Sequence, residues 1–140
     1  MATSPTEALR GVPLFAGLPE EDLEGLGRQM KERRFPGGST VTSEGSGGAG
    51  FFVIVEGQAT VVVGDEERSH LGPGDHFGEI ALIDEGMRSA TITADTDLLC
   101  YGMTAWEFRP FVEEHPQVAW VMLKTLARRL REAQAHEHTH

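Results

Sequence analysis

The sequence predicts an α+β protein, mainly β, in which N-terminal helices and two C-terminal helices flank an antiparallel β-roll of jelly-roll-like, barrel form. Seventeen glycines in 140 residues are typical of tight turns between strands. Short β-rich runs recur at a spacing of about ten residues through the middle of the chain. Apolar residues at helical spacing gather towards its two ends. The length fits one domain, residues 1–140, with a single core.

Helical patterns cover about residues 5–31. Ser4 is typical of a helix N-cap, and Pro5 suits the first turn that follows it. A second segment carries four apolar residues near helical spacing, Leu18, Leu23, Leu26 and Met30. We expect the basic cluster "KERR", residues 31–34, to be a solvated helix end.

The β-roll is expected over residues 33–103. "GFFVIVEG" and "QATVVVGD" predict two strands around Gly57 in the pattern of a hairpin, and "RSHLGPGDHF" predicts a strand, a turn and a short run. "SATITADTDLLCYGM" predicts two more strands with a break near Asp95–Asp97. The loop "SEGSGGAG" lacks the lysine and the following helix of a P-loop, so we interpret it as a turn. Cys100, the single cysteine, is expected to be buried in a strand.

Two helices are expected over residues 104–135. Thr104 would cap the first, and Pro116 would stand in the first turn of the second, which is long and amphipathic. The apolar stripe of this second helix consists of Val118, Val121, Met122, Leu126 and Leu130. The histidine-containing tail, residues 136–140, is expected to fray.

The charge of the chain bears on its partners. Twelve basic and 22 acidic side chains give a net charge of −10 at pH 7, which repels nucleic acid and anionic membranes. No apolar run approaches the roughly 18 residues of a membrane span, and the N-terminus has no signal-peptide pattern. We therefore expect a cytoplasmic protein without nucleic-acid or membrane partners, which must hold any anion at a local site.

The stretch "FGEIALIDEGMRSAT", residues 77–91, has the parts of a phosphate site. Arg88 offers a planar guanidinium that stays charged, and Ser89 adds a hydroxyl beside it. Gly78 lets the chain turn into a single helical turn, where the N–H groups of Ile80 and Ala81 would point at an anion.

Glu79 needs a different task, because a carboxylate facing a phosphate would repel it. A charged carboxylate accepts hydrogen bonds well from a sugar hydroxyl. A cyclic nucleotide presents one phosphate and one free ribose hydroxyl side by side, which fits Glu79 together with Arg88. The alternative is that Glu79 and Arg88 form an ordinary surface ion pair, worth about 0–1 kcal/mol.

The stretch resembles the phosphate-binding cassette of the cyclic nucleotide-binding domain family, which includes the bacterial catabolite activator protein and the regulatory subunits of protein kinase A. The matching positions are Phe77, Gly78, Glu79, Ile80, Ala81, Leu82, Arg88, Ser89, Ala90 and Thr91. The resemblance covers nearly the whole chain, with hinge and lid helices over residues 104–135.

The resemblance implies a sensor without catalytic activity, whose ligand is cAMP or possibly cGMP and which needs no cofactor. Arg88 and Ser89 would hold the cyclic phosphate together with the N–H groups of the Gly78–Ala81 turn. Glu79 would bind the ribose 2′-hydroxyl, and Val61 would line the base pocket.

The resemblance also implies an output. The C-terminal helices would repack over the pocket when ligand binds, and Arg129 would tie the lid to Glu79. An unknown protein effector would read this change, and the last helix could pair with a second copy. Ala133 and Gln134 stand where the bacterial activator has hydroxyl residues that reach the base, so the preference for cAMP over cGMP stays open. Whether the chain is free-standing or a fragment of a larger protein also stays open.

Two alternatives to a sensor remain. His70, His76 and Glu79 lie close together in the sequence, in a turn like that of the cupins, which are metal-binding β-barrel proteins. The cupin His-x-His pair is missing from the barrel region, so His76 is interpreted as bordering the roll. The second alternative is a domain of the same fold that no longer binds nucleotide and acts as an interaction module.

Overall fold

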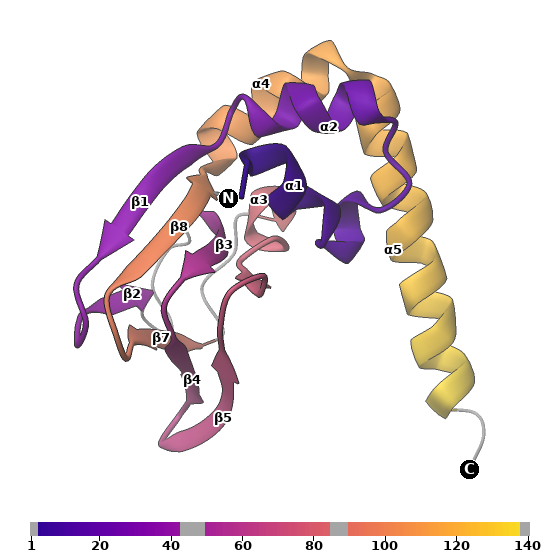
Figure 1. Cartoon of the computed structure of the whole chain (residues 1–140). Coiled ribbons are helices and arrows are strands. Elements are labelled where there is room, and N and C mark those ends of the chain that lie inside the picture. Colours follow the sequence, from indigo (N-terminus) through magenta and orange to yellow (C-terminus); the bar gives the residue numbers. More distant parts are fainter. Residues whose placement is uncertain (1–2, 43–49, 85–89, 138–140) are drawn as a thin grey trace.

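The computed structural model describes residues 3–42, 50–84 and 90–137, with Asp84, His136 and Glu137 described by their backbone alone. Helices from both ends of the chain lie together beside a β-roll (Figure 1). The N-terminal elements are α1 (Pro5–Arg10), the 3-10 turn η1 (Pro13–Phe15) and α2 (Glu20–Gly27). The C-terminal helices are α4 (Ala105–Glu114) and α5 (Pro116–Glu137). The predicted class, antiparallel sheets flanked by helices at both ends, is confirmed, although the jelly-roll label describes it loosely.

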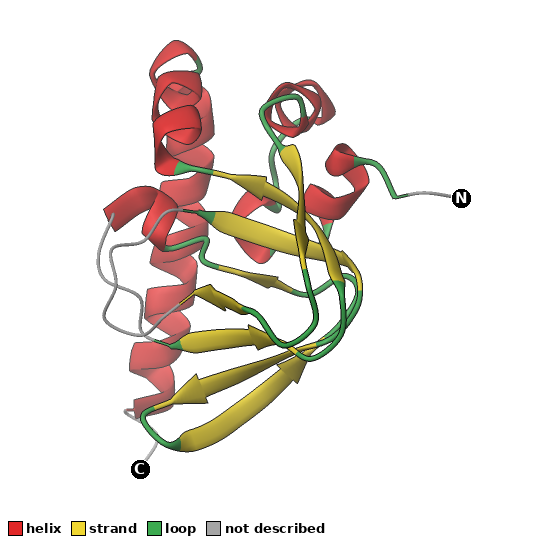
Figure 2. Cartoon of the chain, turned by 90° about the vertical axis from the view of Figure 1, so that its left-hand side faces the viewer, coloured by secondary structure: helices red, strands yellow, loops and turns green. Residues whose placement is uncertain are grey.

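Eight strands in the described residues form the roll, which Figure 2 shows as two layers of strands beside α5. One four-stranded sheet has the order β1-β8-β3-β6, and the other has the order β2-β7-β4-β5. Every pairing within them is antiparallel. The strands are β1 (Lys31–Phe35), β2 (Thr40–Thr42), β3 (Phe51–Glu56), β4 (Ala59–Val63), β5 (Glu66–Leu71), β6 (His76–Phe77), β7 (Thr91–Ala94) and β8 (Leu98–Met103).

The hairpin expected around Gly57 is wrong, because β3 and β4 belong to different sheets. The chain turns a corner at Gly57 and Gln58, and this corner binds the corner between β7 and β8. Gln58 N–H donates to Thr96 Oγ1 over 3.0 Å, and Asp95 N–H donates to Gln58 O over 2.8 Å. The two corners therefore hold each other, and β3 pairs with β8 while β4 pairs with β7.

The N-terminal helical segment is shorter than the expected 5–31. Helix α2 ends at Gly27, and residues 31–34 form most of β1, so their interpretation as a helix end is wrong. These residues pair with β8 in a regular register, from Lys31 with Gly102 to Phe35 with Leu98. Pairing with β8 outweighs their local helical preference. Their charged, exposed side chains suit a sheet edge, where they discourage further pairing.

The helix ends follow the sequence signals. Ser4 Oγ accepts a hydrogen bond from the N–H of Glu7 over 3.2 Å, which confirms the cap of α1. Thr104 forms a capping box with Glu107, and Pro116 begins α5. Helix α5 continues to Glu137, two residues beyond the expected end, and residues 138–140 lie outside the described ranges. The expected turn "SEGSGGAG" also lies mostly outside them, at residues 43–49.

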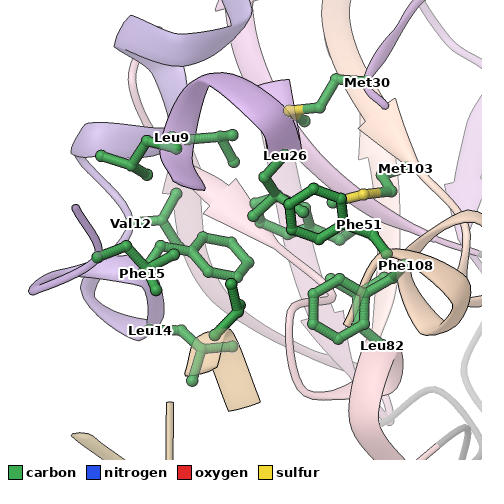
Figure 3. Packing of buried hydrophobic residues seen from close by; sticks show 14 of the residues in the cluster. Leu9, Val12, Leu14, Phe15, Leu26, Met30, Phe51, Leu82, Met103 and Phe108 are labelled. Atoms are coloured by element: carbon green, nitrogen blue, oxygen red, sulfur yellow. The ribbon is translucent and has the colours of Figure 1, made fainter. Parts of the chain in front are cut away.

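Two apolar clusters hold the fold. The larger lies between the helices and the first sheet, and Figure 3 shows ten labelled members: Leu9, Val12, Leu14, Phe15, Leu26, Met30, Phe51, Leu82, Met103 and Phe108. The smaller fills the roll, and consists of Ile54, Ala59, Phe77, Ile92, Ala94, Leu98 and Cys100. The prediction that Cys100 is buried is confirmed, and burial raises the pKa of its thiol to about 11.

Substituting Gly57 with alanine tests the corner between β3 and β4. Gly57 has φ +101°, and a Cβ there would lie 2.3 Å from the carbonyl oxygen of Asp97. Gly38 has a similar φ of +90°, but nothing lies within 4 Å of its Cβ position. Gly38→Ala should lower the free energy of unfolding by about 1–2 kcal/mol. Gly57→Ala should lower it by at least about 2 kcal/mol more, because backbone atoms must also move.

Urea unfolding followed by circular dichroism measures both variants. Equal losses of stability in Gly57→Ala and Gly38→Ala would contradict the close approach of the two corners.

Candidate functional site

The stretch 77–91 crosses from one sheet to the other. It begins at the end of β6, which pairs with β3 in the first sheet, and it ends at the start of β7, which pairs with β4 in the second. Between them lies the short helix α3 (Ala81–Asp84). The stretch therefore connects the two layers of the roll.

A tight turn joins β6 to α3, as the sequence predicted. Gly78 has φ +87°, a left-handed conformation that glycine adopts without strain. Hydrogen bonds run from the N–H groups of Ala81, Leu82 and Ile83 to the carbonyl oxygens three residues earlier, over 3.0–3.2 Å. The N–H of Ala81, one of the two expected phosphate donors, is thus bound to Gly78 O. The N–H of Ile80, the other donor, has no hydrogen-bond acceptor among the described residues.

Glu79 is held by a histidine, and its surroundings favour the ionised form of its carboxyl. His76 Nδ1 lies 3.2 Å from Glu79 Oε2, and the side chains of the two residues are 22% and 15% exposed. This hydrogen bond lowers the pKa of Glu79, while burial opposes the shift. The N–H of Glu79 itself and the charges of His76 and Arg129 lower this pKa further. A carboxylate that stays charged in a half-buried turn is a strong acceptor for a hydroxyl group.

The phosphate side of the predicted site lies mainly outside the described residues. Arg88 and Ser89 belong to the range 85–89, so the structure leaves their roles as predictions. The alternative of a surface ion pair between Glu79 and Arg88 is equally untested. Within the described part of the chain, the hydrogen-bond partner of the Glu79 side chain is His76.

Val61 lies on β4, between Ser69 of β5 and Ile92 of β7. Its side chain is partly buried against the apolar cluster inside the roll. Because Ile92 follows directly after Thr91, where the cassette ends, Val61 stands beside the far end of the cassette. This position is compatible with the expected base pocket, although the contact of Val61 with a base stays a prediction.

The structure separates the residues of the metal-site alternative. His70 contacts Thr60 and Glu67 on the second sheet, whereas His76 contacts Glu79. In the described ranges, no group of three or more histidine, cysteine, aspartate or glutamate residues could hold a metal ion. His76 borders the roll on β6, as expected. Its hydrogen bond to Glu79 was missed, although the spacing of three residues across a glycine turn was a usable signal.

The other side of α3 faces the C-terminal helices. Leu82 is 4% exposed and lies beside Phe108 of α4 in the larger cluster (Figure 3). A cavity of about 460 Å³ separates α3, α4 and α5, and its apolar lining includes Leu82, Phe108, Val112, Met122 and Leu126. One short helix therefore follows Glu79 and also inserts a side chain into the core beneath the hinge. The motif includes Leu82, but no pattern in the sequence indicates this contact with α4.

The second half of α5 is largely exposed. Val118 and Met122 are buried, as the predicted stripe requires, but Leu130 is 61% exposed. Arg129, Ala133 and Gln134 are exposed as well. In the described part of the chain Arg129 makes no ion pair with Glu79, and it acts on the pKa of this carboxyl only through its charge.

None of the helices in the described ranges combines the length and the apolar character that a membrane span requires.

Comparisons with known proteins agree with this geometry. A family model described as "Cyclic nucleotide-binding domain" matches residues 32–115. A "Cyclic AMP receptor protein" of Thermus thermophilus is 33% identical over 130 residues, covering 89% of this chain and 60% of that protein. A cyclic nucleotide-gated potassium channel of Rhizobium etli is 34% identical over 123 residues, covering 88% of this chain and 34% of the channel.

A solved structure is similar over almost its whole length. The N-terminal domain of a transcriptional regulator from Streptomyces coelicolor superposes with a TM-score of 0.85 and 31% identity, covering 95% of this chain and 96% of that chain. These relatives are regulators and a channel, which agrees with a binding domain rather than an enzyme. Because they include a transcriptional regulator and a channel, the expected absence of nucleic-acid and membrane partners stays a prediction.

The hydrogen bond from His76 should control the ionisation of Glu79. In the wild type, the pKa of Glu79 should lie below the ordinary value for a glutamate. In His76→Leu it should rise, because the largest contribution that offsets burial is then lost, although the N–H of Glu79 and the charge of Arg129 still favour the charged form. The lowered pKa stabilises the fold at neutral pH, and this stabilisation is lost as the pH falls through the pKa of folded Glu79.

Carbon-detected NMR titration of the Glu79 carboxyl measures this pKa. His76→Asn, which has the shape of leucine and keeps a donor, is the matched control and should retain the low value. An unchanged pKa in His76→Leu would show that the hydrogen bond is not what lowers it.

Proposed function

This chain belongs to the cyclic nucleotide-binding domain family, and from that premise we propose that it senses cAMP and transmits binding through its C-terminal helices. The observation that carries the proposal is the contact of the Glu79 carboxylate with His76, in the glycine turn between β6 and α3. This contact lowers the pKa of Glu79 and so favours its charged form. This turn opens the stretch that joins both sheets. A charged acceptor in that position suits a neutral hydroxyl of a ligand and disfavours an anionic group.

Arg88 and Ser89 supply the other half of the proposed site. The net charge of −10 works against anion binding in general, so a phosphate needs a local cation and directed donors. Arg88 is the cation of this stretch, with the Ser89 hydroxyl beside it and the N–H of Ile80 at the start of the stretch. We propose that these groups bind the cyclic phosphate while Glu79 accepts a hydrogen bond from the ribose 2′-hydroxyl.

The choice of cAMP rests on the relatives. The Thermus thermophilus protein that is 33% identical to this chain over 130 residues is a cyclic AMP receptor protein. Ala133 and Gln134 offer no hydroxyl to the base, so selectivity would come from the roll, where Val61 lies beside β7. A binding test therefore has to compare the affinity for cAMP with the affinity for cGMP.

The proposed output begins at Leu82. A change in the cassette turn moves α3, and Leu82 passes this movement to Phe108 of α4 because close-packed interiors transmit displacement. The cavity between α3, α4 and α5 leaves space for these helices to repack. We propose that α5 then approaches the roll and Arg129 approaches Glu79. Ligand can favour that arrangement only by its difference in affinity for the two states.

The exposed part of α5 is the surface that we expect a partner to use. Trp120, Leu123 and Leu130 are 61%, 56% and 61% exposed, which is unusual for large apolar side chains on one helix. A second copy of this chain, pairing through α5, would cover them. An effector protein is the other partner that this proposal allows.

Removing Arg88 should abolish most of the affinity for a cyclic nucleotide. Arg88→Ala should weaken binding roughly 30- to several-thousand-fold, because the proposed phosphate site loses the one basic residue of the stretch 77–91. Glu79→Ala should weaken it less, by about tenfold, because it removes a hydrogen bond to a neutral hydroxyl. Isothermal titration calorimetry with cAMP, cGMP and 5′-AMP measures these affinities and the base preference.

Arg34→Ala, on the exposed edge strand β1, is the matched control and should bind like the wild type. If Arg88→Ala weakens cyclic-nucleotide binding less than threefold, this loop does not bind the phosphate. If the wild type binds none of the three nucleotides, the better interpretation is a domain of the same fold that no longer binds nucleotide and acts as an interaction module.

Arg129→Ala tests the lid. It should weaken cAMP binding and keep α5 away from the roll when ligand is present, because the attraction between Arg129 and Glu79 is lost. Arg128→Ala, the neighbouring exposed arginine, should change neither quantity. Spin labels on cysteines introduced at Glu66 of β5 and Ala127 of α5 report the position of the lid, since the thiol of Cys100 is buried and unreactive. If Arg129→Ala keeps the wild-type affinity and the wild-type distance between the labels, the proposed interaction of Arg129 with Glu79 is wrong.

A further inference from the structure

His76 occupies a fixed place next to the carboxylate that the proposed function uses. It lies on β6, opposite Val53 of β3, at the edge of the first sheet. Its ring centroid is 6.4 Å from that of Phe51, which is fully buried, and its side chain is 22% exposed. The backbone pairing and this aromatic neighbour hold the imidazole ring where it is, independently of any ligand.

The direction of the hydrogen bond follows from the chemistry of the pair. An ionised carboxylate can only accept, so Nδ1 of His76 must carry the hydrogen that lies towards Glu79 Oε2. The conformation of Gly78, with φ +87°, reverses the chain between the two residues and brings the side chains to the same side. The contact is therefore built into the turn.

The carboxylate keeps free acceptor capacity after this contact. An ionised carboxylate offers about four lone-pair sites. His76 and the N–H of Glu79 itself occupy two of them, which leaves capacity for a hydroxyl of a ligand. A glutamate without such a neighbour would sample several rotamers and would lose that freedom on binding. A glutamate that is already fixed before binding loses less conformational entropy when the ligand binds.

We propose that His76 is a positioning residue that orients the Glu79 carboxylate for the ribose 2′-hydroxyl, so that it sets selectivity for ribonucleotides over 2′-deoxyribonucleotides. This inference rests on the proposed function. It predicts a specific pattern of loss. A variant without the donor at His76 binds cAMP more weakly, but it binds a ligand without the 2′-hydroxyl as well as the wild type does.

The test compares cAMP with 2′-deoxy-cAMP by calorimetry on the full chain. In His76→Leu, the affinity for cAMP should fall about three- to tenfold, and the affinity for 2′-deoxy-cAMP should change less than twofold. His76→Asn, with the shape of leucine and a donor near the place of Nδ1, should keep the selectivity of the wild type. His76→Phe removes the donor but keeps a ring, and it provides the same comparison if the leucine variant does not fold.

His70→Leu is the histidine control. His70 contacts Thr60 and Glu67, away from the Glu79 carboxylate, and both affinities should stay unchanged in this variant.

Three results would overturn the inference while the proposed function stands. These are an equal loss for both ligands in His76→Leu, an unchanged affinity for cAMP in that variant, and a His76→Asn protein as unselective as His76→Leu. If instead the wild type binds neither nucleotide, the proposed function fails and this inference fails with it. The wild-type titration separates the two cases.

Discussion

The burial of Leu82 beneath the C-terminal helices is the contact on which the proposed mechanism depends. This residue belongs to α3, three positions after Glu79, yet it packs beside Phe108 in the cluster that joins the helices to the first sheet (Figure 3). One helical turn thus has a polar end next to the proposed ligand and an apolar side in the core. Through this contact, a movement of the turn would pass to α4, and the cavity beside it leaves space for the helices to respond.

The second constraint is electrostatic and local. A chain with a net charge of −10 is a poor receptor for anions in general. The cassette addresses this by dividing its charges, with an ionised carboxylate in the turn after β6 and an arginine in the last part of the stretch. His76 contacts the carboxylate at 3.2 Å, and we propose that this contact orients it towards the hydroxyl of the ligand. The separation of these two charges along the stretch matches a ligand that carries both an anion and a hydroxyl group.

The sequence predicted much of this fold because its signals are local. Ser4, Thr104 and Pro116 mark helix starts through contacts within one turn, and each is where it was expected. The errors concern contacts between distant residues. No local pattern shows that the corner at Gly57 binds the corner at Asp95–Asp97, or that β8 draws residues 31–35 into a strand. At the site, the turn at Gly78 followed from its motif. The three-residue spacing of His76 and Glu79 made a contact across this turn conceivable, and the folded chain shows that their side chains do meet.

The two apolar clusters also bear on how such a domain can change during evolution. Val61, which we expect near the base, packs against the cluster inside the roll, whereas Leu82 and Phe108 belong to the cluster under the helices. Strand β3 joins them, with Phe51 and Val53 in one cluster and Ile54 in the other. Substitutions that alter the preferred base can therefore accumulate in one cluster while the contacts beneath the hinge stay intact. A lineage could acquire a new signal molecule and keep its old output.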